Sequence, residues 1–139
     1  MKSIQLLLLL LVATSCSFAQ DLIFAKQIQS AKINGGELEV VGSVISNDHF
    51  FVAGTFTDTI LVDTVMKVPT GNSSFIAKYN PSGDLDKILT NSGTGYLSIQ
   101  NIHTDHLGNI YVTAFTQGNV LFDTATISTN SGIFSYLII

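Results

Sequence analysis

The chain repeats itself at an offset of 60 residues. Residues 50–79 and 110–139 follow the same order of apolar, acidic and turn-forming residues. Identical pairs that mark the offset are Val52/Val112, Leu61/Leu121, Asp63/Asp123 and Thr64/Thr124. A fixed offset over tens of residues is typical of stacked structural units, because one such unit cannot bury its apolar face alone. The repeat therefore predicts an architecture, but it does not point to a ligand or a reaction.

Short β-type runs separated by turn residues fill the chain after residue 20, and none shows the period of a helix. β-branched and aromatic residues dominate these runs, as they do in half-buried strands. The predicted strands are residues 22–28, 38–45, 50–56, 74–79, 85–89, 97–103, 110–115 and 133–138. Residues 50–56 are apolar on both faces, which favours a central strand. Two longer connections, residues 57–73 and 116–132, are predicted to be surface loops.

The predicted strands fall into two repeats behind a leader. Residues 20–36 hold a leading strand without a partner of its own, residues 37–90 form the first repeat and residues 91–139 form the second repeat. We expect four strands of the first repeat to pair in chain order, whereas the second repeat lacks its fourth strand. The leading strand, residues 21–28, is comparable to the fourth strand of the first repeat. We therefore expect it to complete the last unit of a closed ring.

Residues 1–19 are predicted to be a secretory signal peptide. Lys2 supplies the charged start, a leucine-rich run follows, and residues 17–19 fit a small-x-small cleavage site. The apolar run is far shorter than the roughly 20 residues of a membrane span. We therefore expect a secreted or otherwise extracytoplasmic protein, at the cell surface or in the periplasm of a bacterium.

Cys16 is the only cysteine of the chain, so cleavage after residue 19 would leave no thiol and no disulfide. The alternative starts from residues 13–16, which loosely resemble a bacterial lipobox except that Ala13 stands where leucine is usual. In that case Cys16 is lipidated and anchors the protein to a membrane. Free secretion and lipid anchoring are both retained as predictions.

The charge of the chain argues against nucleic acid as a partner. All six basic residues are lysines, and the mature chain would carry five of them against ten acidic residues. Nucleic-acid binding needs a cationic surface that displaces counterions, and arginine is its usual base and phosphate ligand. An acidic extracytoplasmic surface is the better interpretation.

Three segments carry a family resemblance. Residues 105–115 read DHLGNIYVTAF, residues 51–56 read FVAGTF and residues 74–85 read SFIAKYNPSGDL. The first two resemble the D-x-x-G-N-x-Y-V-T-G-x-F signature of the bacterial secreted SBBP repeats, and the third resembles the F-V-A-K-Y-D-x-x-G-x-L segment of the same family. Ala114 departs from the second glycine, and Asp48-His49 stand where Gly-Asn is usual. The resemblance implies antiparallel four-stranded blades of a β-propeller, and no shared activity.

Propellers close with roughly four to eight blades, and this chain offers about two blade units. Because one blade cannot bury its own faces, we expect the chain to be a truncated product or part of a longer protein. The alternatives are a small antiparallel sandwich, or a chain that assembles with other copies of itself.

Few residues suggest chemistry at a site. His103, Asp105 and His106 are the one cluster of metal-ligating types, to which His49 could add a fourth group, but the interpretation we favour is that Asp105 caps a turn. Residues 80–86 resemble a calcium loop without its acidic spacing, so a hairpin turn is preferred. No nucleophile elbow and no mature thiol is found. We therefore expect no enzymatic activity, no metal and no cofactor.

Modification is a further candidate. Thr59, Thr64 and Thr124 each follow an aspartate and precede an apolar residue, which resembles an O-glycan acceptor motif of some Gram-negative secreted proteins. The alternative is a repeated turn in which the aspartate caps the backbone.

Together these features predict a non-catalytic scaffold or interaction module that binds a protein or glycan partner through its loops. The alternative is part of an extracellular carbohydrate-active or hydrolytic propeller protein, which would need paired acids or a metal site at the centre of the ring.

We expect Cys16→Ala to leave the release of the protein unchanged, because cleavage after residue 19 removes position 16 altogether. Fractionation of cells expressing either form, with mass measurement of the mature N-terminus, checks this. A shift from the membrane fraction to the soluble fraction in the variant would establish the lipid anchor instead.

Overall fold

The computed structural model describes residues 26–31 and 35–138, and all regular elements in these ranges are β-strands. The strands in chain order are β1 (Ile28–Ser30), β2 (Leu38–Ser46), β3 (His49–Phe56), β4 (Ile60–Val62), β5 (Val65–Lys67), β6 (Ser73–Tyr79), β7 (Leu85–Gly93), β8 (Tyr96–Thr104), β9 (Ile110–Phe122) and β10 (Ala125–Ile138). Neighbouring strands are antiparallel. The all-β, antiparallel class predicted from the sequence is confirmed.

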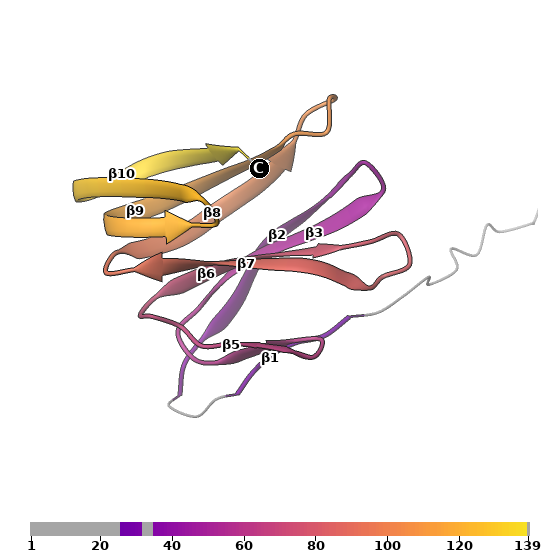
Figure 1. The fold of residues 1–139 in the computed structure, drawn as a ribbon, viewed down its shortest axis with the longest axis horizontal. Coiled ribbons are helices and arrows are strands. Elements are labelled where there is room, and N and C mark those ends of the chain that lie inside the picture. The colour runs from indigo at the N-terminus through magenta and orange to yellow at the C-terminus, as the bar shows by residue number, and fades with distance from the viewer. Residues whose placement is uncertain (1–25, 32–34, 139) are drawn as a thin grey trace, which may run out of the picture.

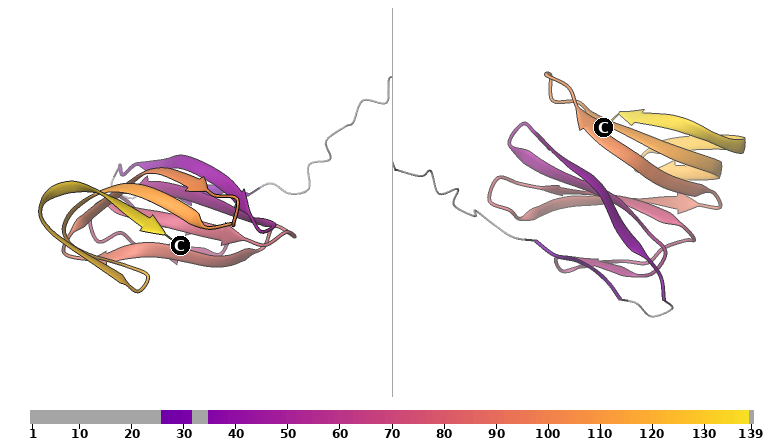
Figure 2. Two further views of the ribbon diagram at one scale, coloured as in Figure 1. Left: turned by 90° about the horizontal axis from the view of Figure 1, so that it is seen from above. Right: turned by 180° about the vertical axis from the view of Figure 1, so that it is seen from behind.

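The strands form two sheets. The large sheet has the strand order β10-β9-β7-β6-β3-β2, with β8 also paired to β9, and it curls into a half-barrel (Figure 1). The small sheet, β1-β4-β5, lies at the opposite end of the molecule from β8, β9 and β10 (Figure 2). Within the large sheet, β2, β3, β6 and β7 pair in chain order, and so do β8, β9 and β10, as the sequence predicts.

The pairing of β2 with β3 recurs, residue by residue, in the pairing of β8 with β9. Val40 pairs with Gly54, and Ile99 pairs with Ala114, which lies 60 positions after Gly54. A register shift follows both pairs, between Val40 and Gly42 in one case and between Ile99 and Asn101 in the other. β-Bulges re-aim the strand that carries them, and β2 and β8 carry theirs at equivalent positions.

The correspondence extends to the strand that crosses into each repeat. β1 pairs with β4, with Ile28 opposite Val62. The last residues of β7 pair with the end of β9, with Asn91 opposite Phe122. β1 therefore occupies the same position beside the hairpin of the first repeat that the end of β7 occupies beside the hairpin of the second repeat. Residues 20–25, which hold most of the predicted leading strand, lie outside the described residues, as do the leader and Cys16.

One predicted loop is absent. Residues 116–132 were expected to form a surface loop, but β9 runs on to Phe122 and β10 begins at Ala125, so most of this segment lies in one long hairpin. Alternation of buried and exposed residues continues through the end of β9, and the end of β7 supplies a further pairing partner. Residues 57–73 do contain a separate short hairpin, formed by β4 and β5.

Two apolar clusters form the core. The first joins the second repeat to the first, and its buried members are Ala53, Ile76, Leu97, Ile99, Ile102, Ile110, Val112, Ala114, Val120 and Phe122. The second lies on the other face of β3 and β6, towards the small sheet, and its buried members are Phe56, Ile60, Val62, Phe75, Ala77 and Tyr79. Both faces of the first repeat's sheet therefore contribute side chains to an apolar cluster.

A buried hydroxyl links the two repeats within the first cluster. The Ser74 hydroxyl donates a hydrogen bond to the carbonyl oxygen of Leu97 over 2.9 Å and accepts one from the N–H of Ile99 over 3.1 Å. The N–H of Ser74 donates to the side-chain oxygen of Asn91 over 2.6 Å. Because Ser74 is fully buried, these bonds satisfy polar groups that would otherwise be costly.

We expect Ile102→Ala to lower the free energy of unfolding by about 2–5 kcal/mol, because Ile102 is buried between the repeats and the truncation leaves a cavity. Urea denaturation measures the change. Leu107→Ala, at a site that is 70% exposed, serves as the control and should change stability by less than about 0.5 kcal/mol. A similar small effect for both variants would contradict the packing described here.

Candidate functional site

Two hairpins occupy equivalent places in the two repeats. β4 and β5 form the first, and the end of β9 with the start of β10 forms the second. Each turns through an aspartate with a positive φ, 52° at Asp63 and 53° at Asp123, followed by a threonine. Aspartate tolerates this left-handed conformation better than most residues, which explains its recurrence at the turn.

Each hairpin has a buried side and a solvent side. Ile60 and Val62 are fully buried in one, as are Val120 and Phe122 in the other. Between them, Leu61 and Leu121 face solvent. Leu61 pairs across the hairpin with Met66, which is 66% exposed. The buried residues anchor the hairpin, and the intervening residues present apolar side chains to the outside.

The predicted modification sites lie on or beside these hairpins. Thr64 and Thr124 are exposed at the two turns. Thr59 precedes β4 and is half-buried; its N–H donates to the Asp58 carboxylate over 2.7 Å, and its carbonyl oxygen accepts from the N–H of Ala31 over 2.8 Å. Attachment of a glycan at these threonines stays a prediction.

A cleft of about 390 Å³ opens where β1 faces the sheet of the first repeat. Its apolar lining comes from Ile28, Val40, Phe50 and Val52, and its polar lining comes from Lys26, Ser43 and Tyr79. Among the described residues, those that line this cleft carry no carboxylate, imidazole or thiol.

Tyr79 is the polar group set deepest in this cleft. Its side chain is 1% exposed, and its hydroxyl has no hydrogen-bond partner among the described residues. The Lys26 ammonium lies 5.9 Å from the centre of the Tyr79 ring and 3.2 Å from the Asp63 carboxylate. Burial, and to a smaller extent the Asp63 charge, raises the pKa of Tyr79 above its ordinary value, so the phenol stays protonated.

Asp105 organises the turn between β8 and β9. One carboxylate oxygen accepts hydrogen bonds from the N–H groups of Leu107 and Asn109, over 2.9 and 3.0 Å. The other accepts from the Asn109 amide over 2.8 Å and from the Tyr111 hydroxyl over 2.9 Å. The hydrogen bond from the Asn109 side chain is the main cause that lowers the pKa of Asp105 to about 2. Asp105 therefore caps a turn, which is the interpretation favoured from the sequence.

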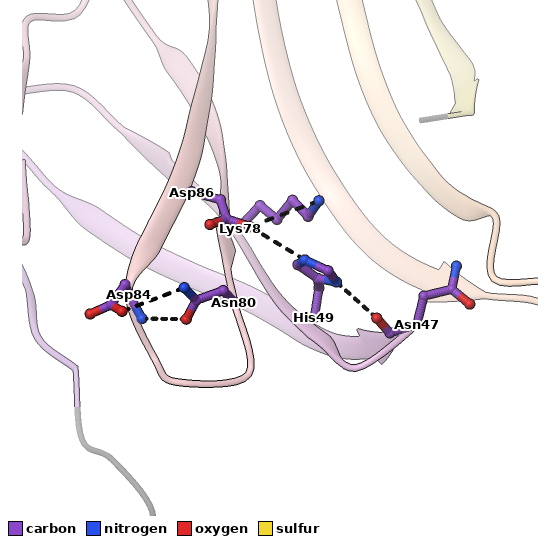
Figure 3. A network of polar contacts seen from close by, with 6 residues as sticks. All are labelled: Asn47, His49, Lys78, Asn80, Asp84 and Asp86. Carbon is purple, nitrogen blue, oxygen red and sulfur yellow. Dashed lines mark hydrogen bonds and ion pairs between the residues drawn. The ribbon is translucent and has the colours of Figure 1, made fainter.

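Of the remaining candidate metal or calcium ligands, His103 and His106 are exposed, and His49, Asn80 and Asp84 make other contacts. The Nε2 atom of His49 lies 3.3 Å from the Asp86 carboxylate, and its Nδ1 atom lies 2.8 Å from the carbonyl oxygen of Asn47 (Figure 3). Asn80 and Asp84 close a tight turn, in which the Asp84 N–H donates to the Asn80 side-chain oxygen over 2.8 Å. In the part of the chain that the structure describes, no three metal-ligating side chains come together, and no helix could cross a membrane.

Comparisons with protein-family models, curated proteins and solved structures give no match for this chain. The resemblance to the SBBP repeats thus stays a prediction from the sequence.

The cleft was not predicted from the sequence. Its lining joins residues from β1, β2, β3 and β6, which the chain brings together only in the folded state. The 60-residue offset does not reveal it, because only the strand registers show that Ser43 corresponds to the buried Ile102.

We expect the Asp105 carboxylate to titrate near pH 2. Because this pKa lies below that of an unfolded aspartate, the contribution of Asp105 to stability is present above about pH 4 and is lost as the pH falls towards 2. Asn109→Ala should raise the pKa most, because it removes the main cause, and Tyr111→Phe should raise it less. NMR titration of the side-chain carboxyl carbon measures each value. A wild-type midpoint near 3.8 would show that the turn does not hold the carboxylate as described.

Proposed function

We propose that this chain is a non-catalytic, secreted or cell-surface module of the β-propeller type that binds a protein or glycan partner through its two hairpins. The observation that carries the proposal is the repeated construction of these hairpins. In both repeats two fully buried residues anchor the hairpin, and the residue between them presents an exposed leucine. In the first hairpin the exposed leucine lies opposite Met66, and methionine is one of the residue types enriched at protein interfaces.

The expected location agrees with this role. The leader predicts export, and the acidic, lysine-only charge pattern favours an extracytoplasmic surface without nucleic acid. The protein would be attached to a membrane only if Cys16 is lipidated. The alternative is part of a carbohydrate-active or hydrolytic propeller protein, which would need paired acids or a metal site at the centre of the ring. Of the described carboxylates, Glu37 and Glu39 line a separate, more polar cleft.

Binding to intact cells of the producing organism tests the proposal. We expect labelled wild-type protein to bind saturably, and Met66→Asp to bind at least about tenfold more weakly, since a charge replaces an exposed apolar contact. Leu107→Asp, in the turn between β8 and β9, is the matched control and should bind as wild type does.

Pretreatment of the cells separates the two kinds of partner. Loss of binding after protease treatment indicates a protein, and loss after periodate oxidation indicates a glycan. Absence of saturable binding, or equal affinity of wild type and Met66→Asp, would reject the hairpins as the contact surface.

A further inference from the structure

The open part of the first repeat corresponds to a buried interface in the second. The matching registers place Val40 at the position of Ile99, Ser43 at that of Ile102, and Val52 at that of Val112. In the second repeat these three positions are at most 3% exposed, because they pack on the first repeat. In the first repeat Val40 is 53% exposed and Ser43 is also exposed.

We call this surface the open face, and define it as Val40, Ser43, Ile45, Phe50 and Val52. Residues directly opposite each other in an antiparallel pair share one side of the sheet, which places all five together. Ile45 is 66% exposed, and the cleft described above lies over the rest. Val40 and Ile45 are thus exposed beside Phe50 and Val52, which are partly buried against the second apolar cluster, so apolar side chains gather at one place that the described part of the chain covers only in part.

The second repeat carries the matching half of such an interface. Inside the chain, the surface that receives the second repeat includes Gly42, Phe51 and Ala53. Their counterparts in the second repeat are Asn101, Tyr111 and Thr113, which with Phe115 we call the outer face. Asn101 is exposed, and the other three are half-buried.

We propose that the open face of one copy of this chain docks on the outer face of a second copy, in the same arrangement in which the second repeat packs on the first. The two surfaces are different, so the contact is head-to-tail and builds a ring or a filament from several copies. This surface is separate from the hairpins, so the proposal stands or falls independently of the proposed function.

One pair of positions favours this occupant over others. Within the chain, Gly42 leaves room for Ile102; a Cβ atom added at Gly42 would lie 3.1 Å from the Ile102 side chain. In the corresponding contact between copies, Asn101 replaces Gly42 and Ser43 replaces Ile102. The larger residue of the pair thus lies on the opposite face, Asn101 in place of Ile102, so that the combined side-chain volume stays similar. Both residues of the second pair are polar.

The polar pair can also form a hydrogen bond. The side-chain oxygen of Asn101 already accepts from the N–H of Ile102 over 2.9 Å, which leaves its NH₂ group to donate. The exposed Ser43 hydroxyl is an acceptor of the right size for it. A partner unrelated to this chain would have no reason to match that exchange.

Sedimentation velocity over a concentration series tests the proposal on the purified protein. We expect wild type to associate reversibly, and Val40→Asp to weaken association at least about tenfold, because an unpaired charge would be buried in the contact. Ser92→Asp, at an exposed site on β7 outside both faces, should associate as wild type does. Urea denaturation confirms that each variant is folded.

A mixing experiment tests the pairing itself. Ser43→Ile and Asn101→Gly should each weaken self-association, because one overfills the contact with Asn101 and the other leaves a gap against Ser43. Mixed in equal amounts, the two variants recreate the Gly–Ile pair between copies and should associate better than either alone. A wild-type protein that stays monomeric at all concentrations, full association of Val40→Asp, or a mixture no better than its components would overturn the proposal.

Discussion

The face-to-face contact between the two repeats is the interaction on which the rest of the structure depends. Burial of apolar surface between β8 and β9 on one side and β2, β3 and β6 on the other supplies the larger apolar cluster. A four-stranded antiparallel sheet has two faces, and neither can be covered by the strands of that sheet. The Ser74 hydroxyl makes this contact directional, because it forms hydrogen bonds with the carbonyl oxygen of Leu97 and the N–H of Ile99 on β8. These two bonds fix the alignment of the two repeats.

Strand β7 turns this packing into a continuous curled sheet. Its first residues pair with β6 in the first repeat, and its last residues pair with β9 in the second. The same strand therefore belongs to both repeats, and the sheet bends where it changes partner. β1 has the second of these roles for the first repeat, since it pairs with β4 as the end of β7 pairs with β9. The same arrangement, a strand from the preceding segment paired with the hairpin of the repeat, thus occurs in both repeats.

Much of the strand order could be predicted from the sequence, because the 60-residue offset and the turn residues mark the strands independently of each other. The strands around residues 50–56 and 74–79 were predicted to within a residue, since apolar runs with clear turn borders leave little freedom. The end of β9 was missed, because Gln117 to Asn119 reads as a polar loop when its pairing with β8 and β10 is unknown. The cap at Asp105 was predicted, as aspartate two residues before a turn N–H is a local signal. The cleft was not, because folding brings β6 and β1 together beside the β2–β3 hairpin, and no local pattern in the chain marks that combination.

A repeat also shows which of its faces is used, provided that equivalent positions are compared one by one. Ile60 and Val120 are both fully buried, so the hairpin anchors have the same environment in both repeats. At the bulge the environments diverge: glycine and isoleucine meet inside the chain, whereas the positions equivalent to them carry asparagine and serine and are exposed. The size change runs in opposite directions on the two faces, which is the exchange that close packing between copies would require under the docking proposed above. The hairpin anchors therefore maintain the fold in both repeats, whereas the bulge positions differ between the contact inside the chain and the proposed contact between copies.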